Sequence, residues 1–422
     1  MNNQQIATFT IFLCGFISLC FNVLVFKPLN DAFQLEKQDQ DDEDYNVVAE
    51  TTMTMTAEHI PKREMIHWND TMKYRNPPTI YICTGSDGNG MGESKLMLST
   101  ALPEYTINDL SQMRIGEGRP PKSFSPEYLE SNYTNPHDIF LSIFFMEKFC
   151  TPKIYRWLLT HFNGQIAIFS GESETSHPIQ GANRDHMHAF GPLIHKRKQD
   201  MVVTYLQMTY MKIFKEILSP SVLVDPNLRP RGNQTHYMIY ANSNCVGFRE
   251  EAVGRLSEFG PIHCAGKCKG KTPPSGNRAN LVKIKTGVGL MNWWDNVKVY
   301  ADYRFCFVME HEKNHPSYMT EKIIMAFSAG CIPIYYGPAE ILDIFNEKAF
   351  VFYNISDPGP ALEKVKALEE NKERYETMLQ EPIVAQGNLT IEKYFSFSDD
   401  IGGGAMKRKF RETLGLGDHF VP

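Results

Sequence analysis

The chain has 422 residues, enough for two compact domains with additional segments. Its 42% hydrophobic and 22% charged residues are typical of a globular protein, and its formal net charge of -6 argues against a general nucleic-acid binder. The sequence contains no Walker-type glycine-rich loop, no Cys/His cluster with zinc spacing and no internal repeat.

Residues 6–26 form an apolar segment without a charge, long enough to cross a bilayer as a helix. A cleaved signal peptide would have basic residues before a shorter apolar core and small residues at a cleavage site after it. Residues 1–5 contain no basic residue, and Lys27-Pro28-Leu29 is a poor cleavage site. We therefore predict an uncleaved signal anchor, with residues 1–5 in the cytoplasm and the bulk of the chain in the lumen.

The segment after the anchor, residues 27–76, is acidic and polar with little periodicity, which predicts a flexible stem. N-x-[ST] sequons are spread over the chain beyond the anchor, and none contains proline. This spread agrees with passage through the secretory lumen and predicts N-glycosylation there. The five asparagines are Asn69, Asn132, Asn233, Asn354 and Asn388.

Residues 77–225 have the pattern of a first α/β domain. Apolar runs predict strands at residues 79–85, 139–145 and 165–170, and the spacing predicts a helix over residues 152–162. The run at residues 165–170 leads into a polar loop that contains Glu172 and Glu174. The proline-rich stretch over residues 219–232 predicts a linker.

Residues 236–400 repeat the α/β pattern, and we expect residues 401–422 to be a polar, solvated tail. Strands are predicted at residues 236–242, 261–266 and 349–354, and helices at residues 249–259 and 361–379. This alternation supports an α/β fold with two domains, but it does not select one architecture within that class.

Seven cysteines follow the apolar segment, so at least one thiol stays unpaired within a single chain. Cys306 and Cys331 lie inside predicted strands, where we expect buried free thiols. Cys264 and Cys268 bracket a glycine in a loop, which suits a local disulfide, whereas a zinc site would lack two further ligands.

The stretch from residue 303 to residue 338 reads as strand, polar loop, helix and strand. The first strand stops at Glu310; Thr320 is a candidate helix cap, and Gly330 is placed to end the helix. If the helix begins at or before Tyr318, then Tyr318, Glu321 and Lys322 share one face.

Parallel α/β sheets bind ligands beyond the carboxyl ends of their strands. A lysine in a first helical turn suits an anion such as a diphosphate, because the unpaired N–H groups and the helix dipole attract negative charge there. The alternative is an exposed Lys322 paired with a nearby acid.

The spaced residues Met309-Glu310-His311, Tyr318 through Lys322, and Ile332 through Pro338 resemble the signature of the α1,3-fucosyltransferases, glycosyltransferase family 10. His311 stands where the family usually has asparagine, and the loop after it is slightly longer. The resemblance implies a GT-B-like fold, in which two doubly wound Rossmann-like domains face a cleft. Here that fold would follow the transmembrane helix and stem.

The resemblance also implies a function. A family member transfers L-fucose from GDP-fucose to a glycan hydroxyl in α1,3 linkage, by inverting displacement with a general base. The acceptor would be a glycan on a glycoprotein or glycolipid, and the enzyme a single-pass type II Golgi membrane protein with a lumenal catalytic part. We expect no obligatory metal or other cofactor, while stimulation by Mn²⁺ stays open.

The family's segment for the base aligns with Glu172-Ser173 and Ser176-His177, so Glu172 is the candidate base. The alternative is that Glu172 and Glu174 only decorate a surface loop. The N-glycan core, a Lewis-type antenna and a protein-linked sugar all remain open as acceptors.

The family places an arginine after a Ser-Asn pair, which here points to Arg249 after Ser243-Asn244 as the partner of Lys322 at the phosphates. Arg255 is the alternative arginine on that helix. Contacts to sugar or ribose hydroxyls are expected from two carboxylates, and contacts near the donor from three further side chains. These five residues are Glu310, Glu321, Tyr318, Asn244 and His311.

Two other functions fit the same sequence. One is a different nucleotide-sugar transferase of the GT-B class, and the other is a catalytically silent lumenal glycan-binding protein, which the departure at His311 would suit.

Overall fold

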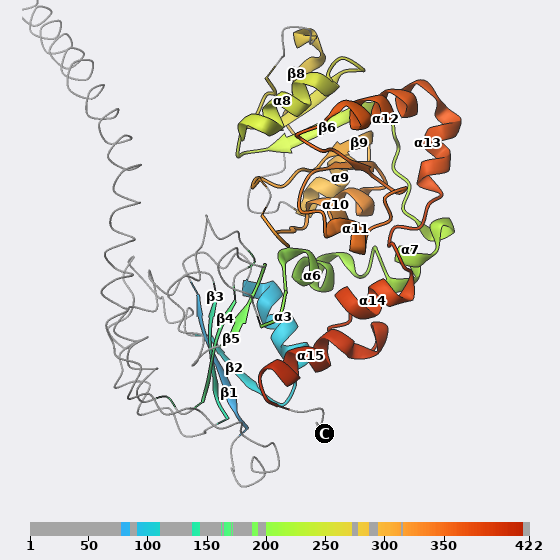
Figure 1. Ribbon diagram of the computed structural model, residues 1–422. Helices are drawn as coiled ribbons and strands as arrows, with labels where there is room; N and C mark the ends of the chain where they lie inside the picture. The colour runs from blue at the N-terminus through green and yellow to red at the C-terminus, as the bar shows by residue number, and fades with distance from the viewer. Residues whose placement is uncertain are drawn as a thin grey trace, which may run out of the picture. The chain divides into compact units, whose positions relative to one another are not determined.

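The computed structural model describes residues 77–84, 91–109, 137–143, 162, 164–169, 171, 188–192, 200–271, 277–286, 294–313 and 315–416 (Figure 1). Contacts divide the chain into residues 1–61 and residues 62–422, and every described residue belongs to the second unit. Among the described residues, no helix has the length and apolar character that a membrane crossing requires. The predicted anchor, stem and cytoplasmic tail lie outside the described residues.

The first sheet is parallel throughout, with strand order β2-β1-β3-β4-β5. β1, β3 and β4 confirm the three strands predicted near residues 79, 139 and 165. Their buried apolar residues at successive positions are typical of a strand covered on both faces. The helix α3 follows β1. The bounds are β1 Thr79–Thr84, α3 Met91–Ala101, β2 Thr106–Asp109, β3 Ile139–Ile143, β4 Gln165–Phe169 and β5 His188–Phe190.

The second sheet is also parallel, with strand order β11-β10-β9-β6-β7-β8. The strand bounds are β6 His236–Asn242, β7 Ile262–Gly266, β8 Leu281–Lys283, β9 Tyr303–Phe307, β10 Ile332–Tyr335 and β11 Val351–Phe352. The helix bounds are α8 Gly247–Leu256, α9 Asn296–Tyr300, α10 Lys322–Ala329, α11 Ile341–Ile344, α12 Gly359–Glu370 and α13 Lys372–Leu379.

Both faces of the second sheet are buried, as its apolar strands require. Phe305 and Phe307 of β9 belong to one apolar cluster, together with residues of α8 and α12, whereas Cys306 between them belongs to another, together with residues of α9 and α10. The alternation places one helical layer on each face.

A mainly helical segment links the two sheets, through α6 (Tyr205–Thr209), a π-helical turn (Tyr210–Phe214) and α7 (Pro220–Val224). The proline-rich stretch over residues 219–232 contains α7 and is anchored by Arg229, which is 2% exposed. Its guanidinium donates to the carbonyls of Ala349, Met378 and Glu381. Burial lowers the pKa of Arg229 to about 10.

The expectation of a polar tail after residue 400 is wrong for residues 405–413. These residues form α15 (Ala405–Thr413), in which Phe410 and Arg411 are buried, and the Arg411 Nη1 atom lies 3.1 Å from the carbonyl oxygen of Ala101 in α3. Met406, Phe410 and Leu414 repeat every fourth residue and bury one stripe, which the intervening basic residues hide in the sequence.

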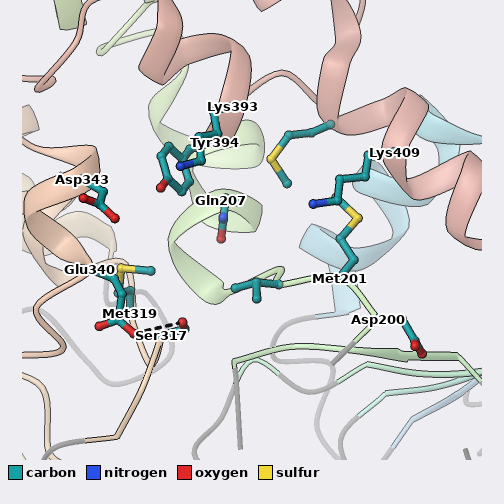
Figure 2. Close-up of a pocket in the computed structure, with 12 residues that line it drawn as sticks. Asp200, Met201, Gln207, Ser317, Met319, Glu340, Asp343, Lys393, Tyr394 and Lys409 are labelled. Carbon is teal, nitrogen blue, oxygen red and sulfur yellow. Dashed lines mark hydrogen bonds between the residues drawn. The ribbon is translucent and has the colours of Figure 1, made fainter. Parts of the chain in front are cut away.

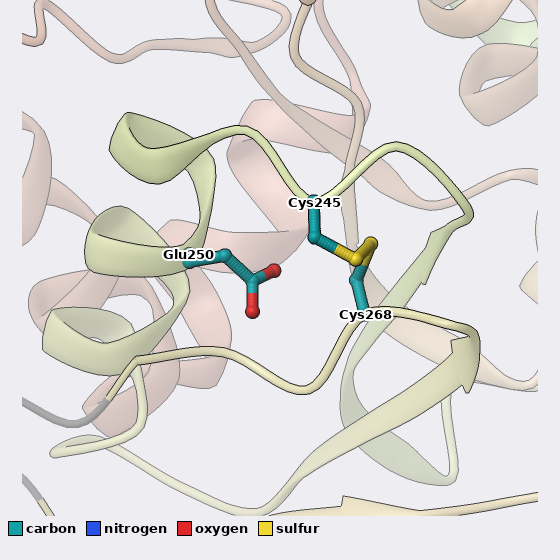
Figure 3. Close-up of side chains that lie close together, drawn as sticks. All are labelled: Cys245, Glu250 and Cys268. Atoms are coloured by element: carbon teal, nitrogen blue, oxygen red, sulfur yellow. A yellow bond between two sulfur atoms is a disulfide. The ribbon is translucent and has the colours of Figure 1, made fainter. Parts of the chain in front are cut away.

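The predictions of free thiols at Cys306 and Cys331 and of a Cys264–Cys268 disulfide are also wrong. Cys306 in β9 and Cys331 just before β10 form a disulfide with their Cα atoms 5.9 Å apart. Cys268 pairs with Cys245 instead of Cys264, with a Cα separation of 5.2 Å (Figure 3). Cys264 is a buried free thiol. Neighbouring parallel strands bring distant cysteines within bonding range, which spacing along the chain does not reveal.

Candidate active site

Glu310 follows β9 at the carboxyl end of the second sheet and is 0% exposed. Its carboxylate accepts hydrogen bonds from the Thr320 backbone N–H (2.8 Å), the Thr320 hydroxyl (2.9 and 3.0 Å), the Tyr335 hydroxyl (3.3 Å) and the Lys322 ammonium (3.1 Å). A buried carboxylate needs this many donors to offset the loss of water.

These contacts differ from the prediction that Glu310 binds sugar or ribose hydroxyls, because the carboxylate has no surface left for a ligand. Thr320 and Tyr335, which the sequence did not single out for the site, are what enclose it. The sequence gives only a general indication of these two residues, because a glutamate at the end of a buried strand requires hydrogen-bond donors from its neighbours.

Lys322 is the first residue of α10, so the sequence placed it correctly at the start of this helix. The helix begins later than expected, with Glu321 at the N-cap and without a side-chain cap, while the Thr320 hydroxyl serves Glu310. Tyr318, Glu321 and Lys322 therefore do not share a helical face.

The Lys322 ammonium is held in place and remains within reach of a ligand. The Lys322 Nζ atom lies 3.1 Å from Glu310 Oε2 and 2.7 Å from the Thr320 hydroxyl oxygen. The Lys322 side chain keeps 20% of its surface exposed. Desolvation by itself would lower the pKa of Lys322, but Glu310 and Glu321 outweigh it and raise the pKa, so the side chain is positively charged.

Arg249 lies in the first turn of α8, and it is 2% exposed. Its Nε atom donates to the Glu310 carbonyl (3.1 Å) and its Nη2 atom to the Met309 carbonyl, so the guanidinium braces the end of β9. The Nη1 contacts to Asn242 Oδ1 and the Asn244 carbonyl are both 3.4 Å, longer than ordinary N–H···O bonds. Nη1 is therefore the donor that an anionic ligand could most readily recruit.

Glu310 joins the two predicted cations, since Arg249 binds its backbone and Lys322 binds its carboxylate. Burial lowers the pKa of the Arg249 guanidinium, and Glu310 opposes that effect. Arg255, the alternative arginine, pairs with Glu251 on the surface of α8. The structure thus brings Arg249 and Lys322 to one strand end, as the resemblance implied.

Tyr318 and His311 complete the cluster. The Tyr318 hydroxyl and His311 Nδ1 are 3.2 Å apart, and the two rings meet edge to face at 5.2 Å. Desolvation, then Lys322 and Arg249, lower the pKa of His311, which favours the neutral ring. His311 Nε2 lies 3.5 Å from Glu312, consistent with a proton on Nε2 and a Tyr318 hydroxyl that donates to Nδ1.

Glu321 is partly exposed, and its Oε1 lies 3.8 Å from the Lys322 ammonium. Asn244 is exposed in the loop between β6 and α8, and the Cys245–Cys268 disulfide ties this loop to the loop after β7 (Figure 3). Glu250 lies beside the two sulfurs. Because these sulfurs bond each other, they offer no thiolate to a metal ion.

The candidate base, Glu172, and Glu174 lie outside the described residues, as do Asn69 and Asn132. The described part of that region ends at Gly171, just beyond β4, where an added Cβ would come within 2.8 Å of the Tyr205 ring in α6. Only glycine fits that close approach. Asn233, Asn354 and Asn388 are exposed.

Comparison with known proteins bears on the second half of the chain. Residues 231–380 match the model of the glycosyltransferase family 10 (fucosyltransferase) C-terminal domain. This part of the chain is thus similar to the C-terminal domain of the family 10 fucosyltransferases. The matched region includes the residues predicted at the donor, Arg249, Glu310, Tyr318, Glu321 and Lys322.

Two curated relatives match parts of this chain. An Acanthamoeba polyphaga mimivirus protein named as a fucosyltransferase is 25% identical over 139 residues, 33% of this chain and 22% of its own. An α-(1,3)-fucosyltransferase of Helicobacter pylori is 34% identical over 82 residues, 19% of this chain and 17% of its own. The matched regions thus span less than a quarter of these two relatives.

Among solved structures, an α1,3-fucosyltransferase crystallised with GDP is similar over 82% of this chain and 92% of its own, at 17% identity and a TM-score of 0.49.

Proposed function

We propose that this chain transfers L-fucose from GDP-fucose to a glycan hydroxyl in α1,3 linkage, in protein glycosylation. The observation that carries the proposal is the Glu310 cluster, which lies within the family 10 match and holds a charged lysine at a helix start. In this proposal the two sheets belong to the two facing domains of a GT-B fold, with boundaries near residues 77–225 and 236–400.

The chemistry follows from the charge that appears during transfer. The acceptor oxygen attacks the anomeric carbon of fucose, the bond from that carbon to the phosphate oxygen breaks, and GDP leaves with the electron pair. Lys322 and the Nη1 group of Arg249 stabilise the negative charge on the departing diphosphate. Glu172 takes the proton of the acceptor hydroxyl.

The contacts refine the roles that the resemblance implied. Glu310 positions Lys322 and Arg249 through its carboxylate and its carbonyl, and it does not touch the donor. Glu321 and Tyr318 stay candidates for the donor's hydroxyl groups, and Asn244 and His311 for contacts nearby. No obligatory metal is proposed; stimulation by Mn²⁺ remains a question for assay.

The cellular setting belongs to the proposal as well. Residues 6–26 would anchor the enzyme in the Golgi membrane as a single-pass type II protein, and residues 27–76 would space it from the bilayer. N-glycans would then sit on the five sequons. The exposure of Asn233, Asn354 and Asn388 supports that expectation.

Donor screening tests the reaction class. Calorimetry with GDP-fucose and a set of UDP-sugars should give binding of GDP-fucose alone, and a glycan array should then identify the acceptor. Binding of a UDP-sugar without GDP-fucose would favour another nucleotide-sugar transferase. Donor binding without turnover on any glycan would favour the silent glycan-binding protein.

The proposed base is tested by Glu172→Gln, which removes the proton acceptor and keeps the side-chain shape. We expect GDP-fucose binding to persist while transfer falls by a factor on the order of 100 or more, the range for loss of a general base. Glu174→Gln is the matched control and should retain activity. Full activity of Glu172→Gln would move the base elsewhere.

A further inference from the structure

A cavity of about 350 Å³ lies next to the loop that carries the Lys322 cluster (Figure 2). Ser317 and Met319 of this loop line the cavity, whereas Tyr318 and Thr320 contact His311 and Glu310. Its volume is at the lower end of the range for small-molecule sites. The cavity is therefore distinct from the Lys322 cluster but shares a loop with it.

The cavity has an apolar, buried interior and a charged, open rim. Met201, Met319 and Met406 are at most 5% exposed, while Asp343 on α11 and Lys409 on α15 are exposed. Figure 2 shows the Gln207 amide in the middle of these side chains, with Asp343 on one side and Lys409 on the other. Such a layout suits a ligand that enters from solvent.

Gln207 of α6 is 1% exposed and points its amide nitrogen into the cavity. Its Oε1 atom accepts from the Thr204 backbone N–H (2.7 Å) and from the Thr204 hydroxyl. Because a backbone N–H only donates, the atom that faces it must be the oxygen, and the Nε2 group must point the other way. Among the described residues, Nε2 has no hydrogen-bond acceptor, and it is not one of the fully buried side-chain atoms that lack a partner.

An amide held in place with two unused N–H donors is costly unless a ligand or water accepts from it. The same cavity offers acceptors in the carboxylates of Glu340 and Asp343 and an aromatic surface in Tyr394, over which the Lys393 ammonium lies at 4.8 Å. Sugar hydroxyls donate and accept at once, so they match both kinds of group.

The charges around the cavity favour a neutral ligand over an anion. Three carboxylates line it against two lysines, a formal balance of -1. An acidic sugar would meet net repulsion. The acids are Asp200, Glu340 and Asp343, and the lysines are Lys393 and Lys409.

We propose that this cavity binds a neutral oligosaccharide, with the Gln207 amide donating to one of its oxygens. The Leu206 N–H of α6 donates to the Met319 carbonyl (3.3 Å), which joins the cavity wall to the loop that leads to Lys322. The bound sugar would be the part of the acceptor glycan away from the reacting hydroxyl. The identification of this sugar as part of the acceptor rests on the proposed function, whereas the proposal that the cavity binds a neutral oligosaccharide does not.

The test uses Gln207→Glu, which keeps an oxygen for Thr204 and replaces the Nε2 donor with a second oxygen. The full chain is applied to an array of neutral, sialylated and sulfated oligosaccharides, and the strongest neutral binder is titrated by calorimetry. We expect neutral oligosaccharides to be preferred, and Gln207→Glu to bind the chosen one about tenfold or more weakly. Glu412→Gln, an exposed change on α15 outside the cavity, should bind as the unchanged chain does.

Three results would overturn the proposal: no binding of neutral oligosaccharides, equal affinity in Gln207→Glu, or a preference for the anionic ones. If Gln207→Glu fails to fold, Asp343→Asn on the exposed rim replaces it, with a severalfold loss expected and no loss overturning the proposal. Titration of GDP into the unchanged chain separates the two proposals. If the chain binds a neutral oligosaccharide but not GDP, only the proposed function is refuted. If it binds GDP but no neutral oligosaccharide, only the proposal for the cavity is refuted.

Discussion

Two buried polar side chains at the loop between β9 and α10, Glu310 and Gln207, differ in how far their hydrogen-bonding groups are paired within the protein. On the Glu310 side, the carboxylate is enclosed by the groups that donate hydrogen bonds to it, and none of its surface is left to a ligand. On the Gln207 side, a buried amide keeps its donors unused beside an open cavity. The Glu310 carboxylate has its hydrogen bonds without a ligand, because its role is to hold the Lys322 charge in place. The Gln207 amide would gain its missing hydrogen bonds from a ligand in the cavity.

The largest effect is expected from removing the centre of the enclosed side. Glu310→Ala leaves Lys322, Thr320 and Tyr335 without their shared acceptor, and we expect a loss of about 3–5 kcal/mol in the free energy of unfolding. Urea unfolding measures it, with Glu363→Ala on the exposed side of α12 as the control. A loss near that of the control would mean that Glu310 does not organise this strand end.

A second effect concerns the helix that the sequence hid. Arg411→Met removes the buried hydrogen bond from α15 to the Ala101 carbonyl and the contact to Glu104 at 2.8 Å. We expect about 2–4 kcal/mol of destabilisation, because Glu104 is left as a buried, unpaired charge. Arg408→Met, on the exposed face of α15, is the control in the same urea series. Equal midpoints for the two variants would count against a packed α15.

The smallest effect is a pH dependence centred on His311. Its pKa is lowered in the folded state by desolvation and by Lys322 and Arg249, so folding favours the neutral ring. This stability is present above the unfolded pKa of about 6.5 and is lost as the pH falls through the lower folded pKa. As the pH falls below about 6.5, the melting temperature of His311→Asn should therefore decrease less steeply than that of the unchanged chain. The same dependence of melting temperature on pH in both proteins would refute the link between His311 protonation and stability.

Local features were predictable from the sequence where one element decides them. The apolar run of β9, the position of Lys322 at the start of α10 and the end of that helix at Gly330, with φ of 77°, follow from patterning and backbone preference. The pairing of Arg249 with Lys322 came from the resemblance, and in the structure both residues contact Glu310.

Features that several elements create together were not predictable. The enclosure of Glu310 needs Thr320 from the loop and Tyr335 from β10, and the disulfides depend on which strands become neighbours. The cavity around Gln207 is lined by residues from segments as far apart in the sequence as Asp200 and Lys409. No periodicity within one segment carries that information.

The central claim is that Lys322, held by Glu310, grips the diphosphate of GDP. Calorimetric titration of GDP into Lys322→Ala tests it most directly, with Lys298→Ala, a lysine 82% exposed on α9, as the control and thermal unfolding to confirm that both fold. The account predicts GDP binding about 10- to 100-fold weaker in Lys322→Ala and unchanged in Lys298→Ala. A folded Lys322→Ala that binds GDP as tightly as the unchanged chain would contradict it.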